Sequence, residues 1–151
     1  MNPVPNKVCP VILRTIGGDL QILAFEHPLA GCQLVKGTIE PGETIHRAAL
    51  RELGEESGIH SASVRRDLGI WAQSDGQVWA FVECAPNRVL AEKWVHHAPD
   101  DEGHDFRFFW QSFSAPFRTE QWHRIFSEAA RFVANAVGST ERNKTGEDEA
   151  G

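Results

Sequence analysis

The sequence lacks tyrosine altogether and has only three cysteines among its 151 residues. Cys9, Cys32 and Cys84 are widely spaced and form no Cys-x-x-Cys pair, so the sequence supports neither a disulfide framework nor a thiolate zinc site. Basic residues are also scarce, because 15 Lys and Arg stand against 21 Asp and Glu and give a net charge of −6. Nucleic-acid binding relies on Lys and Arg that displace condensed counterions, so we expect no stable nucleic-acid binding.

Long apolar runs are lacking as well. No stretch approaches the roughly 18 consecutive apolar residues of a membrane-spanning helix, and residues 1–13 do not resemble a secretory signal. We therefore expect a cytoplasmic protein without a membrane partner. A hydrophobic fraction of 41% and a charged fraction of 24% are ordinary for one globular domain, which we assign to residues 1–138. Residues 139–151 carry four acids against two bases and are predicted to form a disordered polar tail.

Runs of Val, Ile, Leu and aromatic residues predict several β-strands. The predicted strands cover residues 7–14, 19–25, 33–35, 63–73, 77–83 and 106–113. Gly17 and Gly18 separate the first two runs and predict a hairpin, because glycine accepts the positive φ of a tight turn. The run 77–83 is apolar on both faces, which indicates a strand in the interior of a sheet.

Two helices are predicted. One covers residues 120–137 between an N-cap at Thr119 and a terminator at Gly138, and its apolar stripe is expected to pack on the protein's own sheet. The other begins after an N-cap at Thr44 and ends at Gly58, since glycine favours the left-handed conformation of a helix end.

Three acidic residues of this second helix lie on one face. At about 100° per residue, Glu52, Glu55 and Glu56 form a patch that overlaps the edge of the helix's apolar arc. Like charges at this spacing repel each other, so a cation is expected among them. Clustered carboxylate oxygens suit Mg²⁺ or Mn²⁺. Arg51 precedes Glu55 by four residues, and we expect its salt bridge to orient a carboxylate.

The segment 37–59 reads GTIEPGETIHRAALRELGEESGI. Its Pro41 and Gly42 occupy the two central positions of a predicted type II turn, which directs Glu43 back towards the helix. The segment resembles the motif of the Nudix hydrolases, in which glycine, Glu, an Arg-Glu pair followed by an aliphatic residue, a Glu-Glu pair, and a final glycine followed by an aliphatic residue stand at fixed spacing. Every specified position matches, and nine such positions are far more specific than a lone glycine motif.

The resemblance implies an α/β (α+β) fold, namely an α/β/α sandwich with a mixed β-sheet and a loop-helix-loop catalytic motif. It also implies a metal-dependent pyrophosphohydrolase that uses Mg²⁺ or Mn²⁺ to cleave the diphosphate linkage of a nucleoside diphosphate derivative or a nucleoside triphosphate. The positions that match the family's metal ligands are Gly37, through its carbonyl, Glu52, Glu55 and Glu56. Glu52 also resembles the catalytic base, and Glu43 and Arg51 resemble the pair that braces the catalytic helix.

Members of this family often draw a base or a further metal ligand from a later loop. The candidates in this sequence are Glu92, Asp100, Asp101 and Glu102. No spacing rule chooses among them. We expect substrate contacts from Glu102 and from Lys36, which directly precedes the motif, although an exposed lysine at a strand end needs no function.

Residues 96–105 concentrate three histidines and four acids. A second metal site is one interpretation, and a loop beside the cleft is favoured because Pro99 and Gly103 suit a loop between strands. One or two aromatic side chains are expected to line the pocket, where they would stack on a base, while the others belong to the core. The aromatic candidates are Trp71, Trp79, Phe81, Phe109 and Trp110.

Two classes of function stay open. The favoured class is the hydrolase, which the complete set of acids supports. The alternative is a non-catalytic nucleotide-ligand-binding Nudix module, and an isomerase of prenyl diphosphates ranks third because its additional catalytic residues are not identified. The expected partner is a small-molecule nucleoside diphosphate-type substrate, and an exposed strand edge or the final helix would support a homodimer.

Overall fold

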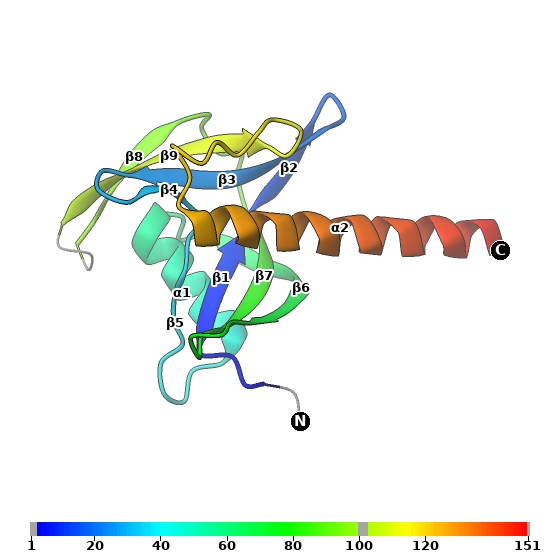
Figure 1. Cartoon of the computed structure of the whole chain (residues 1–151), viewed down its shortest axis with the longest axis horizontal. Helices are drawn as coiled ribbons and strands as arrows, with labels where there is room; N and C mark the ends of the chain where they lie inside the picture. The colour runs from blue at the N-terminus through cyan, green and yellow to red at the C-terminus, as the bar shows by residue number, and fades with distance from the viewer. Residues whose placement is uncertain (1–2, 100–102, 151) are drawn as a thin grey trace.

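The structure is a computed structural model that describes residues 3–99 and 103–150, with side chains described as far as residue 139. Within these residues, the strands fall into two sheets (Figure 1). The strands of the first sheet are β1 (Lys7–Val11), β5 (Gly37–Thr38), β6 (Ala62–Ala72) and β7 (Val78–Pro86). This sheet has the order β5-β1-β7-β6 and is mixed, because β1 and β7 are parallel while the other pairs are antiparallel. We call it the mixed sheet.

The second sheet is antiparallel throughout and is called the antiparallel sheet here. Its strands are β2 (Leu13–Ile16), β3 (Asp19–His27), β4 (Gly31–Gln33), β8 (Trp94–Ala98) and β9 (His104–Ser112). The order is β2-β3-β9-β8, with β4 also paired to β3. The chain passes between the two sheets three times, from β1 to β2, from β4 to β5 and from β7 to β8.

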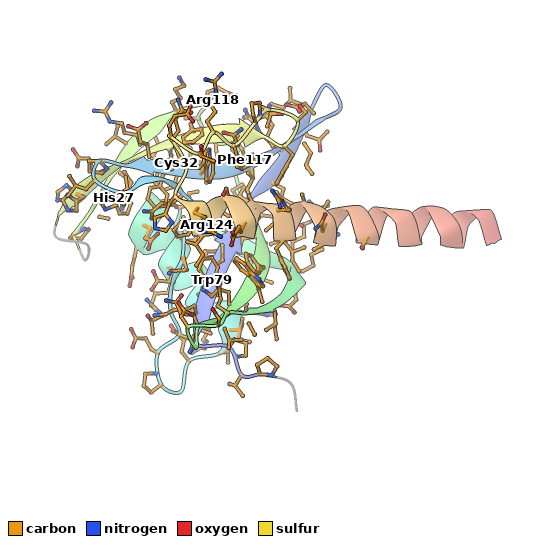
Figure 2. The ribbon with its side chains drawn as sticks, viewed as in Figure 1. His27, Cys32, Trp79, Phe117, Arg118 and Arg124 are labelled. Carbon is orange, nitrogen blue, oxygen red and sulfur yellow. The ribbon has the colours of Figure 1, made fainter. Side chains whose placement is uncertain are left out.

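Helices α1 (Ile45–Ser57) and α2 (Arg124–Ala150) cover opposite faces of these sheets. Neighbouring residues of a strand therefore enter different cores. Val8 packs in the core beneath α1, whereas Cys9 packs in the core beneath α2 together with Trp79 and Phe126 (Figure 2). Two apolar layers on either side of the sheets confirm the predicted α/β/α sandwich with a mixed sheet.

The strand predictions are confirmed for most of the runs. Gly17 and Gly18 turn the β2-β3 hairpin with φ values of 56° and 79°, and β7 lies in the interior of the mixed sheet between β1 and β6. The run 7–14 is two strands rather than one, because β1 pairs with β7 and β2 pairs with β3. The predicted strand 33–35 lies two residues too late, and the short strands β5 and β8 were not predicted.

Both predicted ends of α2 are wrong. The helix begins at Arg124 rather than at residue 120, because the preceding segment pairs with β4: the Cys32 amide donates to the Gln121 carbonyl at 2.8 Å, and the His123 amide donates to the Cys32 carbonyl at 3.2 Å. Gly138 does not end the helix, since it is not among the glycines with a positive φ, and the helix continues to Ala150. Figure 1 shows the later part of α2 extending beyond both sheets.

A disordered tail at 139–151 stays a prediction. Among the residues that the structure describes, neither helix is long and apolar enough to cross a membrane.

Candidate active site

Local capping chemistry determines where α1 begins and ends. At its start, the Thr44 hydroxyl accepts a hydrogen bond from the Arg47 amide at 3.2 Å, which satisfies one of the unpaired amides of a helix N-terminus. At its end, Gly58 adopts a left-handed φ of 80° and its amide donates to the Gly54 carbonyl at 2.9 Å. Both predicted ends of this helix are confirmed.

Strand β8 holds the last turn of α1 from the side. The Trp94 indole Nε1 donates to the Ser57 carbonyl at 3.0 Å, and His96 Nε2 lies 2.9 Å from the Glu55 carbonyl. A carbonyl oxygen can only accept, so His96 Nε2 carries the proton. The His96 ring lies so close to Gly58 that a Cβ at Gly58 would come within 2.8 Å of Nδ1. The turn of helix that bears Glu55 is therefore held by two side chains of one strand.

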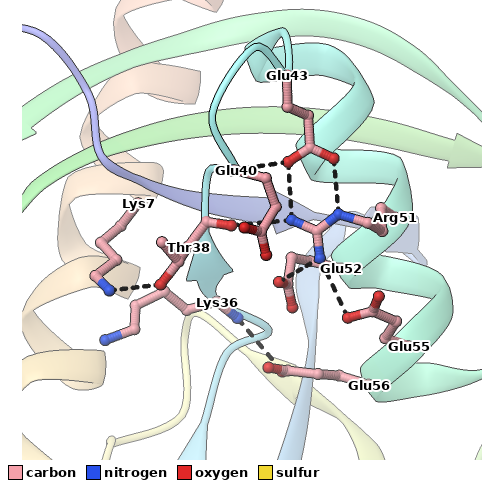
Figure 3. A network of polar contacts seen from close by, with 9 residues as sticks. All are labelled: Lys7, Lys36, Thr38, Glu40, Glu43, Arg51, Glu52, Glu55 and Glu56. Atoms are coloured by element: carbon pink, nitrogen blue, oxygen red, sulfur yellow. Dashed lines mark hydrogen bonds and ion pairs between the residues drawn. The ribbon is translucent and has the colours of Figure 1, made fainter. Parts of the chain in front are cut away.

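The guanidinium of Arg51 connects the loop before α1 to the acids on the helix (Figure 3). Its Nε and Nη2 donate to the two carboxylate oxygens of Glu43 at 2.7 and 2.9 Å, and Nη2 also donates to the Thr38 carbonyl at 2.9 Å. Nη1 donates to Glu52 Oε1 at 2.8 Å and to Glu55 Oε2 at 3.2 Å. One planar cation thus contacts three of the four motif acids in a geometry that lysine does not reproduce.

Burial and this cation shift the pKa values of the motif residues in opposite directions. Hydrogen bonds from Arg51, together with the Glu40 amide, lower the pKa of Glu43 to about 2. Contact with Glu43 in turn raises the pKa of Arg51. Burial raises the pKa of Glu52, although Arg51 opposes the shift. Glu43 is therefore ionised at neutral pH, whereas the buried Glu52 carboxylate accepts a proton more readily than an exposed one.

Gly37 lies against the carboxyl group of Glu52. A Cβ at this position would overlap the Glu52 carboxyl carbon and both of its oxygens, so glycine is required by close approach. The Gly37 backbone therefore stands directly beside the carboxylate that Arg51 orients.

The motif residues line a pocket of about 440 Å³. Its polar wall contains Lys36, Gly37, Glu52, Glu55 and Glu56. Facing that wall are the rings of Phe25, Phe106 and Phe126, the last of them from α2. The Lys36 amide donates to Glu56 Oε2 at 3.4 Å, and this contact joins the segment that follows β4 to helix α1. The arrangement brings together every motif position that was predicted as a metal ligand.

The donor chemistry of this wall fits a hard divalent cation, which takes carboxylate and carbonyl oxygens. No group of three or more His, Cys, Asp or Glu converges as a finished metal cage within residues 3–99 and 103–150. Arg51 contacts one oxygen each of Glu52 and Glu55, so these two carboxylates present their other oxygens for a ligand. The three acids on one pocket wall therefore supply the oxygen donors that such a cation takes.

Among the four later acids, the structure describes Glu92. Glu92 forms a two-pronged ion pair with Arg14 at 2.6 and 2.9 Å, at an exposed position outside the pocket lining. Glu92 is therefore not placed as a metal ligand or base. Asp100, Asp101 and Glu102 lie outside the described residues.

Most of the described residues of the histidine-rich segment 96–105 belong to strands, since β8 reaches Ala98 and β9 begins at His104, whereas Pro99 and Gly103 lie in turns, as predicted. His97 Nδ1 lies 2.8 Å from Asp105 Oδ1 in a cross-strand pair, and His96 contacts α1. The described part of this segment holds no converging metal-site group. Ala98 lines the pocket, so the connection between β8 and β9 starts beside it.

The predicted pocket aromatics are wrong, because none of the five candidates lines this pocket. Trp79 and Phe81 are fully buried in the core beneath α2, while Phe25, Phe106 and Phe126 line the pocket instead. From the sequence, these three phenylalanines could not be told apart from core residues, because each lies in an apolar pattern that core positions share. Trp94 and His96 were missed for a different reason, because their contacts with α1 join residues 37 and 41 positions apart.

Comparison with known proteins agrees with the resemblance of residues 37–59 to the Nudix motif. The NUDIX domain profile matches residues 8–132. The NAD-capped RNA hydrolase NudC of Vibrio parahaemolyticus is 29% identical over 89 residues, which are 57% of this chain and 32% of that protein. The chain thus matches about a third of this curated relative's length.

Solved structures agree on the fold. The crystal structure of UDP-X diphosphatase has a TM-score of 0.61 at 16% identity, over 93% of this chain and 66% of that one. The crystal structure of ADP compounds hydrolase has a TM-score of 0.58 at 18% identity, over 91% and 77% of the two chains. The chain belongs to the NUDIX family, because the domain profile matches residues 8–132 and the acids of the motif helix lie together on one pocket wall.

Proposed function

We propose that this chain is a divalent-metal-dependent hydrolase that cleaves the diphosphate linkage of a nucleoside diphosphate derivative or a nucleoside triphosphate. The observation that carries the proposal is the pocket wall on which Glu52, Glu55 and Glu56 stand beside Gly37 and Lys36. Membership of the NUDIX family supports it, as do relatives and structural neighbours whose names denote hydrolases of nucleotide compounds. The lining combines anionic ligands for a cation with a cation for phosphate.

The proposed ligands of Mg²⁺ or Mn²⁺ are the carboxylates of Glu55 and Glu56 and the carbonyl of Gly37. Glu52 either binds the ion as a further ligand or acts as the base, since Arg51 occupies its other oxygen. When bound, such an ion neutralises phosphate charge and lowers the pKa of a bound water. Arg51 is a positioning residue in this proposal, because it holds Glu52 and Glu55 at fixed oxygens and ties them to Glu43.

Glu52 is the proposed general base. Its Oε1 accepts a hydrogen bond from Arg51, which leaves Oε2 to take the proton of a water molecule that attacks phosphorus. As the new phosphorus–oxygen bond forms, the anhydride phosphorus–oxygen bond breaks and its electron pair departs with the leaving phosphate. Burial raises the pKa of Glu52, and this direction favours proton transfer to it. Lys36 is the proposed phosphate contact, and Glu102 stays a candidate substrate contact.

Three expectations about partners and location stay predictions. One relative is named as an NAD-capped RNA hydrolase. Titration with labelled RNA therefore tests the expectation that this chain does not bind nucleic acid stably. Sedimentation analysis would determine whether the chain forms a homodimer. Localisation of the tagged chain would test the cytoplasmic expectation.

A phosphate-release screen tests the proposed function. The panel contains nucleoside triphosphates, ADP-ribose, nucleotide sugars and dinucleoside polyphosphates, each with and without Mg²⁺ or Mn²⁺ and with and without an added phosphatase. We expect metal-dependent hydrolysis that falls at least about 100-fold in Glu56→Gln. Glu128→Gln is the matched control, because Glu128 is an exposed acid on α2 that does not line the pocket, and it should keep wild-type activity.

Equal activity in Glu56→Gln and the wild type would contradict the proposal, and so would a folded protein that hydrolyses nothing on the panel with either metal. A compound that raises the melting temperature but is not consumed would instead favour the binding-module alternative.

A further inference from the structure

Two of the described strands with five residues or more lie at sheet edges, and they differ in regularity. β6 is an edge of the mixed sheet, and β8 is an edge of the antiparallel sheet (Figure 1). The pairing of β6 with β7 shifts register twice, at residues 64–66 and 67–69, whereas all five residues of β8 pair with β9 without a shift. Bulges disturb an edge and discourage its pairing with another chain. The edge of β8 is therefore the one that is open to such pairing.

The side chains of β8 alternate between two faces. Trp94 and His96 turn inwards, where they contact carbonyl groups of α1. Val95 and His97 therefore point to the outer face, and Lys93, which directly precedes the strand, follows the same alternation. Lys93 and Val95 also line the same hollow of about 870 Å³. The outer face of this edge thus presents the side chains of residues 93, 95 and 97 in one row.

Apolar and charged groups share this row. Val95 is 59% exposed, and Lys93 is exposed as well. His97 Nδ1 lies 2.8 Å from Oδ1 of Asp105, its register partner on β9. An apolar side chain at the middle of the row is therefore flanked by a cation on one side and by an acid on the other.

This pattern matches itself in one antiparallel register. In a strand pair about a two-fold axis, the numbers of opposed residues have a constant sum, and opposed residues point to the same face of the sheet. The axis must therefore pass through a residue rather than between two. With the axis at Val95, each Val95 opposes its own copy and Lys93 opposes His97, which brings Lys93 beside Asp105 of the second copy. An axis at His96 would instead set the apolar Val95 against His97.

We propose that two copies of this chain pair through their β8 edges in antiparallel orientation, with Val95 at the two-fold axis and Lys93 of each copy beside Asp105 of the other. Backbone groups on the outer edge of β8 then bond to the same groups of the second copy, and the antiparallel sheet continues across both. Charge complementarity favours a second copy as the occupant, because the edge offers both the cation and the acid. β8 supplies only Ala98 to the motif pocket, so this inference does not depend on the proposed function.

Sedimentation velocity of the full chain over a range of concentrations tests the pairing, and we expect a wild-type dimer. Val95→Asp removes the apolar contact and places two carboxylates opposite each other, so it should raise the dimer Kd at least about tenfold. Ile70→Asp is the matched control, because Ile70 is a 45% exposed apolar residue on the bulged edge strand β6. Its Kd should stay within about twofold of wild type. Circular dichroism confirms that both variants are folded.

Exchange of the proposed ion pair tests the register. Lys93→Glu and Asp105→Lys each bring like charges together twice in the dimer, so each should raise Kd about fivefold. The double variant restores opposite charges and should return Kd to within about twofold of wild type.

Four results would overturn the proposal. The first is a wild-type chain that is still monomeric at about 100 μM. The second is a Val95→Asp dimer as tight as wild type, and the third is a double variant as weak as the two single variants. The fourth is loss of the dimer in Ile70→Asp with Val95→Asp unchanged, which would place the interface on β6.

Discussion

The two helices cover opposite faces of the same sheets and both pack apolar side chains against them, but α1 is held by polar contacts as well. α1 is fixed at named polar positions: the Thr44 cap, the Gly58 end, the Trp94 indole and the Arg51 guanidinium. α2 is fixed by apolar packing. Its inner face is Phe126, Ala129, Ala130, Val133 and Val137, all at most 5% exposed.

The difference matches what each helix contributes to the pocket. Carboxylates that are to hold a cation must be fixed at the level of single atoms, and directional hydrogen bonds do this better than apolar contacts. α1 supplies three acids to the pocket and α2 supplies only the Phe126 ring. We infer that polar contacts position the helix that bears chemistry, while packing alone suffices for the helix that encloses the pocket.

The largest expected effect comes from glycine replacement in the two regions. Gly37→Ala places a Cβ inside the Glu52 carboxyl group and must displace it, so kcat/KM should fall at least about 100-fold. Gly138→Ala on α2 is the control, because nothing lies within 4 Å of its added Cβ. This control should keep full activity and raise the free energy of unfolding by about 0.5–1 kcal/mol. The measurement is kcat/KM for both variants. A Gly37→Ala enzyme with wild-type activity would contradict the claim that the Glu52 carboxylate needs a glycine beside it.

Arginine replacement should have the next largest effect. Arg51→Met leaves the Glu43, Glu52 and Glu55 carboxylates without their shared cation, and should lower the free energy of unfolding by about 1–3 kcal/mol. Arg124→Met on α2 removes only a contact of a 91% exposed side chain and should change it by less than about 0.5 kcal/mol. Urea denaturation compares the two variants. Equal losses of unfolding free energy in the two variants would show that polar contacts hold α1 no more firmly than α2.

A smaller effect is expected at the helix caps. Thr44→Ala removes the hydroxyl that accepts from the Arg47 amide, and should lower the free energy of unfolding by about 1 kcal/mol. Thr44→Ser should retain most of that stability, because serine supplies the same acceptor. Thr119→Ala tests the cap that the sequence predicted for α2. Since α2 begins only at Arg124, thermal unfolding of this variant should match wild type.

The last prediction concerns how stability changes with pH in the acid range. Glu43 has a pKa lowered from 4.5 to about 2, so its contribution to stability is complete above pH 4.5 and is lost as the pH falls towards 2. Glu43→Gln should therefore show a shallower loss of stability across that interval than wild type. Denaturant midpoints at a series of pH values measure it, and Arg51→Met should remove the same part of the slope. An unchanged slope in Glu43→Gln would contradict the assignment.

The sequence predicted α1 well because its determinants are local. A hydroxyl before the helix, a glycine after it and a period of 3.6 residues locate Glu52, Glu55 and Glu56 on one face. α2 was mispredicted because tertiary contacts override the local pattern: residues 121 and 123 pair with Cys32 instead of starting a helix. Pocket residues such as Phe25 and Phe106 could not be distinguished from core, since both kinds of position are apolar on a strand.

Trp94 and His96 show a second limit. Each contributes through a carbonyl of α1, and sequence spacing does not record which elements are neighbours. The parallel pairing of β1 with β7 joins residues about seventy positions apart in the chain, and it brings Lys7 beside Trp79. Contacts of this kind require the topology, whereas the motif acids require only the helix.

The most direct test of this account is a Mn²⁺ titration followed by electron paramagnetic resonance of the unbound ion. The account predicts that wild-type protein and Glu128→Gln deplete the unbound signal equally, and that Glu55→Gln and Glu56→Gln weaken Mn²⁺ binding at least about tenfold while staying folded. Wild-type affinity in both α1 variants would contradict the claim that α1 is held in place to bind a metal ion.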